Sequence, residues 1–391
     1  MRSSVRVIRF RPPRPLRTIL LVLVAACLVV VFVYRAWLGA EVRAAEAMSV
    51  ALKVPVLGWA VRGVTAAPHA EEVDVAGVPT TVYRPGSGSS WPTLVFLNGV
   101  TAQGRHQKDV VRLARGLARV GFLVLVPDPP GLARGELTER TLDSTVAVVR
   151  AAAARPDARG GRVALFGVSV GGSLGLLAAE QPALAKRVTV VAAIAPYTDL
   201  ANVVLLATTG YTREQGRFVR YSARPFMPLV IARSLLAQSA PSPERTRLLT
   251  ELLHQPNDAP RPLALFRRLR PTQVEPSLRP LVALLANTNP ARFARLYAAV
   301  PASLRASIRR LSPVAAAARL RAPVDIASAP HDKYFPLGET HELQQAATGT
   351  HVGLTVTSTL HHAVPSLSFG DLAGLVRFDG WAVRVVRAAT L

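Results

Sequence analysis

Apolar and polar positions follow two alternating rhythms through residues 71–195. Residues 71–85 alternate like two short strands around a Gly turn. Continuous apolar runs, typical of strands buried on both faces, lie at 93–97, 121–127, 162–166 and 188–195. Helical periodicity separates them at 110–120 and 142–154. Strands that alternate with helices of this length predict a parallel sheet with crossover helices on both faces.

The rhythm breaks from about 199 to 311, where the chain is helical, rich in Leu, Arg and Pro, and without a convincing strand. Strand patterns return at 323–328 and 352–357, and a closing helix is predicted over 371–390. An insertion at this point lies over the carboxyl ends of the strands, where open α/β sheets place their ligands. We therefore predict a helical cap, with a purely structural appendage as the alternative.

The N-terminus has the pattern of a membrane anchor. Residues 1–17 form a basic tail with six arginines and no acidic residue, and an uncharged apolar run follows. The run predicts a transmembrane anchor over 18–39, with Tyr34 and Trp37 at the interface. The arginines keep the N-terminus cytoplasmic, so the rest of the chain becomes extracytoplasmic. A cleaved signal peptide, or a lipoprotein signal at Cys27, is the alternative.

A juxtamembrane connector is predicted over 40–68, and one large domain over 69–391. The chain has 391 residues, of which 50% are hydrophobic, and a net charge of +23. The basic residues are nearly all arginines, scattered along the chain, so we expect no nucleic-acid binding. Anionic lipid headgroups are a weaker possibility for this positive surface. Cys27 is the only cysteine, which excludes an intrachain disulfide.

The most informative motif is Gly167-Val168-Ser169-Val170-Gly171, between a predicted strand and a predicted helix. Small residues two positions before and after Ser169 let strand and helix approach closely, as a nucleophile elbow requires. The turn exposes the Ser169 hydroxyl at the sheet edge and aims the Val170 N–H at a developing oxyanion. A tight structural turn is the alternative reading of this motif.

A serine nucleophile needs a base and an acid that orients the base. Asp332 follows the strand at 323–328, and His361 and His362 follow the strand at 352–357. All three lie at carboxyl ends of strands, on the same rim as Ser169. Asp332 could instead cap its own turn. The histidine pair shows no His-Glu-x-x-His spacing, so no metal site is predicted.

These residues resemble the α/β-hydrolase superfamily, in particular serine esterases and dienelactone hydrolases, over about residues 71–391. The resemblance implies an α/β-hydrolase fold: a mostly parallel doubly wound sheet with a helical cap. It also implies the chain order Ser, acid, His. Asp332 matches the acid, although Ala329 stands where such families usually carry glycine.

The base implied by the resemblance is His362, with His361 as runner-up. Two further carboxylates, Asp128 and Asp199, also follow predicted strands, and Asp128 is better suited to shaping a loop. The second oxyanion donor is expected from the backbone N–H of Val100, in the loop that begins at Asn98. Asn98 departs from the histidine that the family usually shows there.

We therefore expect a membrane-anchored serine hydrolase that cleaves a carboxylic ester, with a hydrophobic or lipid-like acyl substrate, through an acyl-enzyme on Ser169. No metal or organic cofactor is expected. Peptidase, thioesterase, acyltransferase or perhydrolase chemistry on the same triad is the alternative, because fold does not fix function. A non-catalytic hydrolase-like binding domain at the membrane is the rival from another class.

Overall fold

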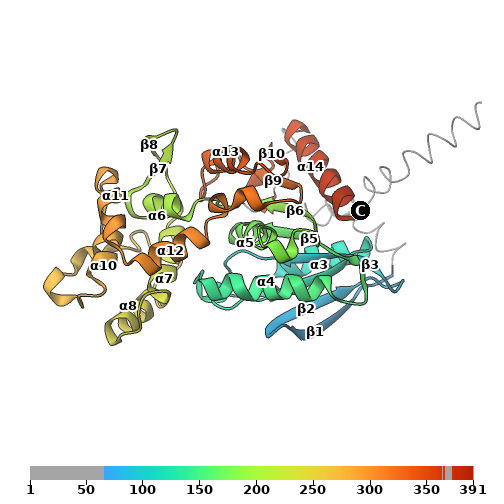
Figure 1. Cartoon of the computed structure of the whole chain (residues 1–391), viewed down its shortest axis with the longest axis horizontal. Helices are drawn as coiled ribbons and strands as arrows, with labels where there is room; N and C mark the ends of the chain where they lie inside the picture. The colour runs from blue at the N-terminus through green and yellow to red at the C-terminus, as the bar shows by residue number, and fades with distance from the viewer. Residues whose placement is uncertain (1–65, 363, 366–371, 391) are drawn as a thin grey trace, which may run out of the picture.

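A computed structural model describes residues 66–362, 364–365 and 372–390 of the chain. The eight-stranded main sheet has the order β1-β2-β4-β3-β5-β6-β9-β10 (Figure 1). Its strands are β1 His69–Val75, β2 Val78–Arg84, β3 Trp91–Leu97, β4 Leu123–Pro127, β5 Ala158–Val168, β6 Val188–Ile194, β9 Val324–Ser328 and β10 Val352–Val356. Strand β2 is antiparallel to both neighbours, and the pairs from β4 to β10 are parallel. The predicted sheet is thus present.

Helices cover both faces of this sheet. They are α3 Lys108–Arg119, α4 Glu139–Ala153, α5 Val170–Ala179, α13 Leu337–Ala346 and α14 Leu372–Thr390. Successive strand residues point to opposite faces, so Val95 and Leu97 join the core beneath α4 and α5. Leu94 and Phe96 join the core beneath α3 and α14. The predicted doubly wound architecture is confirmed.

Local sequence sets where several helices begin. At α4, the Thr138 hydroxyl accepts the N–H of Thr141, and the Thr141 hydroxyl accepts the N–H of Thr138. This reciprocal pair satisfies two backbone donors at the helix start. At α3, the Gln107 side chain accepts two N–H groups of the first turn. In each case, the hydrogen bonds of the N-terminal residue fix where the crossover helix begins.

The insertion after β6 consists mainly of helices at one end of the molecule (Figure 1). They are α6 Leu200–Thr209, α7 Phe226–Ala237, α8 Pro243–Leu253, α9 Ala264–Arg268, α10 Arg279–Leu285, α11 Pro290–Ala299 and α12 Ala302–Arg310. We call residues 199–311 the cap.

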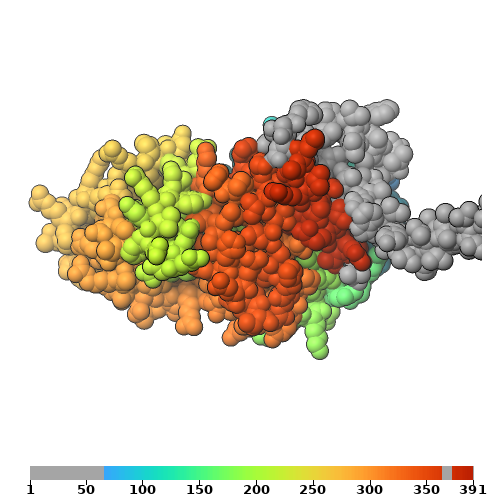
Figure 2. Space-filling model, turned by 90° about the horizontal axis from the view of Figure 1, so that it is seen from above, coloured from blue at the N-terminus to red at the C-terminus, as the bar shows by residue number. Residues whose placement is uncertain are grey.

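The expectation that the cap lacks a strand is wrong. A hairpin of β7 Tyr211–Glu214 and β8 Arg217–Arg220 follows α6. Gly210 ends α6 with a φ of 75°, and Gln215 and Gly216 turn the chain with φ values of 49° and 80°. Two consecutive positive φ angles favour a tight hairpin. In Figure 2 the yellow-green segment that contains this hairpin lies on the surface beside the orange-red C-terminal part.

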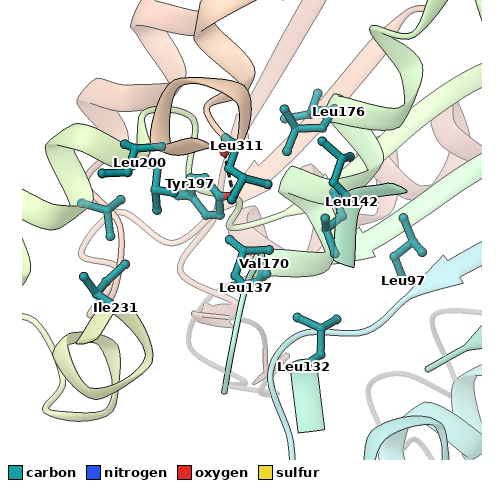
Figure 3. Packing of buried hydrophobic residues seen from close by; sticks show 14 of the residues in the cluster. Leu97, Leu132, Leu137, Leu142, Val170, Leu176, Tyr197, Leu200, Ile231 and Leu311 are labelled. Carbon is teal, nitrogen blue, oxygen red and sulfur yellow. Dashed lines mark hydrogen bonds between the residues drawn. The ribbon is translucent and has the colours of Figure 1, made fainter. Parts of the chain in front are cut away.

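Hydrogen bonds connect the segments at the two ends of the cap with each other and with α5. The Tyr197 hydroxyl donates to the Leu311 carbonyl at 2.9 Å, and the Ser173 hydroxyl donates to the Tyr197 carbonyl at 2.7 Å. Figure 3 shows Tyr197 and Val170 between leucines of the body and cap residues such as Leu200. One apolar core therefore continues from the sheet into the cap.

The predicted basic tail, anchor and most of the connector, residues 1–65, lie outside the described residues. Within the described ranges, no helix is both long enough and apolar enough to cross a membrane.

Candidate active site

Ser169 occupies a strained turn between β5 and α5. Its φ is 54° and its ψ is −126°, and its N–H donates to the Ile194 carbonyl at 2.8 Å. A Cβ on Gly167 would lie 2.4 Å from the Gly171 carbonyl oxygen, and a Cβ on Gly171 would lie 2.0 Å from the Leu97 carbonyl oxygen. Both glycines are therefore needed for the approach of strand, helix and neighbouring strand.

The structure brings Ser169, His362 and Asp332 together. His362 Nε2 lies 3.1 Å from Ser169 Oγ, and His362 Nδ1 lies 2.8 Å from Asp332 Oδ2. These are hydrogen-bonding distances, in the order nucleophile, base and orienting acid. His361 is exposed and lies in β11 Leu360–His361, which pairs with β12 Val364–Pro365. Of the two candidate histidines, only His362 reaches the serine in this structure.

The acid is held from behind by its own loop. Asp332 is buried, and its Oδ1 accepts the N–H groups of Tyr334 at 2.7 Å and Phe335 at 3.0 Å. The Tyr221 hydroxyl, which follows β8, donates to the Asp332 backbone carbonyl. These bonds fix the carboxylate toward His362, so the turn-capping role considered for Asp332 and its contact with the base coexist.

Aromatic rings surround the imidazole. The ring of Tyr334 lies 4.2 Å from that of His362, centroid to centroid, and the ring of Phe335 lies 5.9 Å away. Burial raises the pKa of Tyr334, so its hydroxyl stays protonated at neutral pH. Tyr334 was not among the residues expected at the site. Its position two residues after the acid is a signal that could have drawn attention to it.

The loop that carries Val100 and the start of α5 both adjoin the nucleophile, since a Cβ on Gly99 would lie 3.3 Å from the Ser169 Cβ. Val100 and Val170 line the same cavity as Ser169. Val170 is the first residue of α5, where N–H groups have no acceptor within the helix. Asn98 Nδ2 donates to the Gly104 carbonyl at 3.2 Å, so this side chain braces the loop after β3.

The two alternative acids serve other loops. Asp128 accepts from the Arg105 N–H at 2.8 Å and pairs with the Arg105 guanidinium at 2.6 Å. It thereby fastens the loop after β3, as the loop-shaping interpretation expects. Asp199 accepts from the Ala201 N–H at 2.8 Å and caps α6. Neither carboxylate is hydrogen-bonded to His362 in the described structure.

A cavity of about 410 Å³ opens at Ser169 and His362. Most of its lining is apolar, from both the cap and the sheet. Its volume is within the usual range for small-molecule sites, which combine an apolar lining with a few placed polar groups. Among the described residues that line the cavity, the one carboxylate is Asp109, which is ion-paired with Arg112.

A further buried carboxylate joins the body to the cap, and no sequence pattern singled it out. Glu339, on α13, accepts the N–H groups of Thr198 at 2.9 Å and Asp199 at 3.3 Å. It also accepts from Asn202 Nδ2 at 3.3 Å. Burial raises the pKa of Glu339 from 4.5 to about 8, against the effect of its N–H donors. Glu339 thus joins the helix after the acid loop to the first helix of the cap.

Sheet topology, elbow and triad geometry define a serine hydrolase of the α/β-hydrolase fold. The sequence model that describes the X-Pro dipeptidyl-peptidase family (S15) matches residues 74–362, which are 289 of the 391 residues. The chain therefore belongs to the S15 family. The match ends at His362, so it contains all three members of the triad.

Solved structures with similar folds include an acylaminoacyl peptidase from Pyrococcus horikoshii, at 13% identity and a TM-score of 0.44 over 76% of this chain and 38% of that one. Dipeptidyl peptidase 4 from Porphyromonas gingivalis is 11% identical, with a TM-score of 0.46 over 84% of this chain and 37% of that one. Dienelactone hydrolase from Anabaena variabilis is 11% identical, with a TM-score of 0.40 over 82% of this chain and 97% of that one. The chain thus spans less than half the length of the two peptidases. No curated protein sequence matches it.

Proposed function

We propose that the protein is a serine peptidase that cleaves an amide bond through an acyl-enzyme on Ser169. The observation that carries the proposal is the family match, which extends from the sheet to His362 and contains the triad. The family's description names an X-Pro dipeptidyl-peptidase, so a peptide bond after proline is the first substrate to test. The ester substrate favoured in the sequence analysis becomes the second candidate.

The triad geometry supports the proton transfers of the proposed reaction. His362 Nε2 takes the proton of Ser169 Oγ as Oγ bonds to the carbonyl carbon. The N–H groups of Val100 and Val170 receive the oxyanion, and each such donor is typically worth about 3 kcal/mol in the transition state. The C–N bond then breaks and His362 returns the proton to the leaving amine. Water, deprotonated by His362, releases the acid and restores Ser169.

Ester cleavage is supported by a specific feature, the apolar lining of the cavity at Ser169. An ester passes through the same tetrahedral intermediate, and its alcohol is an easier leaving group than an amine. The triad alone does not distinguish the two bonds, because both need the same base and oxyanion donors.

The test compares Gly-Pro and Ala-Pro p-nitroanilides with p-nitrophenyl butyrate on the full-length protein and on Ser169→Ala. We expect anilide turnover that falls by about 10⁴-fold or more in the variant. If the ester is hydrolysed at Ser169 and neither anilide is, the peptidase proposal is wrong and the esterase candidate replaces it. If a fluorophosphonate labels neither folded protein, the site is not catalytic and the binding-domain rival stands.

A further inference from the structure

The cavity at Ser169 extends in two directions. One part lies under the cap, against residues such as Met227, Val230 and Ile231. The other part lies against the opposite sheet face, between α3 and α14, and we call it the α3–α14 slot. Its walls include Val110, Leu113 and Leu117 on α3, and Phe378, Ala382 and Val385 on α14.

The slot belongs to the same cavity as the nucleophile. Its floor is formed by Leu94 and Phe96 of β3 and Phe166 of β5, and β5 ends at the residue before Ser169. From Leu94 to Asn98 the strand direction covers about 13 Å, at roughly 3.3 Å per residue. The lining positions of α14 run from Phe378 to Ala389, about 17 Å of helix. The slot is therefore long in one direction.

The chemistry of the slot favours a hydrocarbon. The polar side chains Gln107, Asp109 and Arg112 line the slot at the N-terminal end of α3. The other described side chains that line the slot are aliphatic or aromatic, and the indole nitrogen of Trp381 is their one polar atom. A peptide main chain placed there would leave amide groups without partners, which is costly. An alkyl chain needs none.

We propose that the α3–α14 slot binds the linear alkyl chain of the acyl group that is transferred to Ser169. The substrates are then amides or esters of medium-chain or long-chain fatty acids. We assign the chain to the acyl side because the acyl group stays bonded to Ser169 through both steps. Contacts in the slot can therefore stabilise both transition states. The inference rests on the acyl transfer proposed for Ser169. It favours the ester candidate, because a fatty acyl group takes the place of an Xaa-Pro acyl group on the serine.

The experiment uses p-nitrophenyl acetate, hexanoate and decanoate, so that the leaving group is constant and the acyl chain varies. Val385→Phe and Leu113→Phe each fill the slot from a different wall, and Leu113 is only partly buried. The matched control is Val376→Phe, the same change on α14 at a side chain that is 71% exposed. Thermal midpoints verify that all variants fold.

For the full-length protein we expect kcat/KM to rise with chain length, by up to about fourfold for each methylene buried. Both slot variants should lose about tenfold or more on decanoate while keeping acetate turnover. Val376→Phe should match the parent on every ester. Because the two slot variants alter different helices, a folding defect in one of them does not remove the test.

The outcomes separate the slot from the activity. If the parent protein turns over no ester and no anilide, the hydrolase activity on which both proposals rest fails. If acetate is hydrolysed but chain length has no effect, or folded slot variants keep decanoate turnover, the slot inference is overturned. It is also overturned if Val230→Phe, under the cap, removes decanoate preference and the slot variants do not. A preference for long alcohols in alkyl butyrates, with none for long acyl chains, places the leaving group there and contradicts the assignment.

Discussion

Tyr334 packs its ring 4.2 Å from the imidazole of His362, while its own N–H donates to Asp332 Oδ1 at 2.7 Å. One residue thus contacts both the base and the acid that orients the base. The backbone contact does not depend on the side chain, but the ring contact does. The ring limits how far the imidazole can rotate away from Ser169.

Removing the Tyr334 ring should lower kcat more than it changes KM. We expect Tyr334→Ala to lose about tenfold in kcat, because small displacements of a catalytic group are costly. Tyr334→Phe keeps the ring and should restore most of the rate. Steady-state kinetics on one ester measures both variants. Equal losses in the two variants would show that the hydroxyl, and not the ring, matters.

The adjacent histidines provide a matched pair. His362→Ala should lower kcat by about 10⁴-fold or more, since it removes the base that lies 3.1 Å from Ser169 Oγ. His361→Ala changes an exposed neighbour and should leave kcat near the parent value. The rate of fluorophosphonate labelling reports the same contrast without a chosen substrate. A reversed pattern would make His361 the base.

Two glycines of one segment should respond oppositely to alanine. A Cβ on Gly171 would lie 2.0 Å from the Leu97 carbonyl oxygen, so Gly171→Ala should cost about 3 kcal/mol or more of stability. A Cβ on Gly175 would have its nearest neighbour at 3.6 Å, and Gly175→Ala should stabilise α5 by about 0.5–1 kcal/mol. Denaturant unfolding measures both, and a mild effect of Gly171→Ala would contradict the elbow packing.

The free energy of unfolding should depend on pH through Glu339. Burial raises its pKa from 4.5 to about 8 in the folded state, so between these values the folded carboxyl keeps a proton that the unfolded one has lost. Stability from this group is therefore full below about pH 4.5 and falls as pH rises toward 8, by at most about 1.4 kcal/mol per pH unit.

Glu339→Gln should flatten this part of the profile, because an amide does not titrate. Denaturant unfolding between pH 5 and pH 8 measures the slope in both proteins. Burial also raises the pKa of Glu180 to about 9, and its slope of the same sign remains in the variant. The difference between the two profiles therefore isolates Glu339. Identical slopes would mean that Glu339 is ionised in the folded protein throughout this range.

Local sequence patterns are sufficient to predict the sheet, the elbow and the order of the triad. Buried strands and amphipathic helices have local periodicities, and the Ser169 turn needs glycines at fixed positions. The hairpin β7–β8 also had a local signal, the Gly216 turn flanked by Tyr and Phe, which the abundance of helix formers around it obscured. These features depend on residues close together in the chain.

The choice of His362, the contact of Tyr334 and the burial of Glu339 follow only from the folded structure. His361 and His362 are the same residue type at adjacent positions, so local sequence does not distinguish them. The path of the chain after β10 directs His362 to Ser169 and leaves His361 exposed. Glu339 meets Thr198 and Asn202 across more than a hundred residues of sequence. Likewise, the α3–α14 slot exists because two distant helices leave space above one sheet face. The spacing between elements that are distant in the sequence follows from how their side chains pack, and no local sequence pattern encodes it.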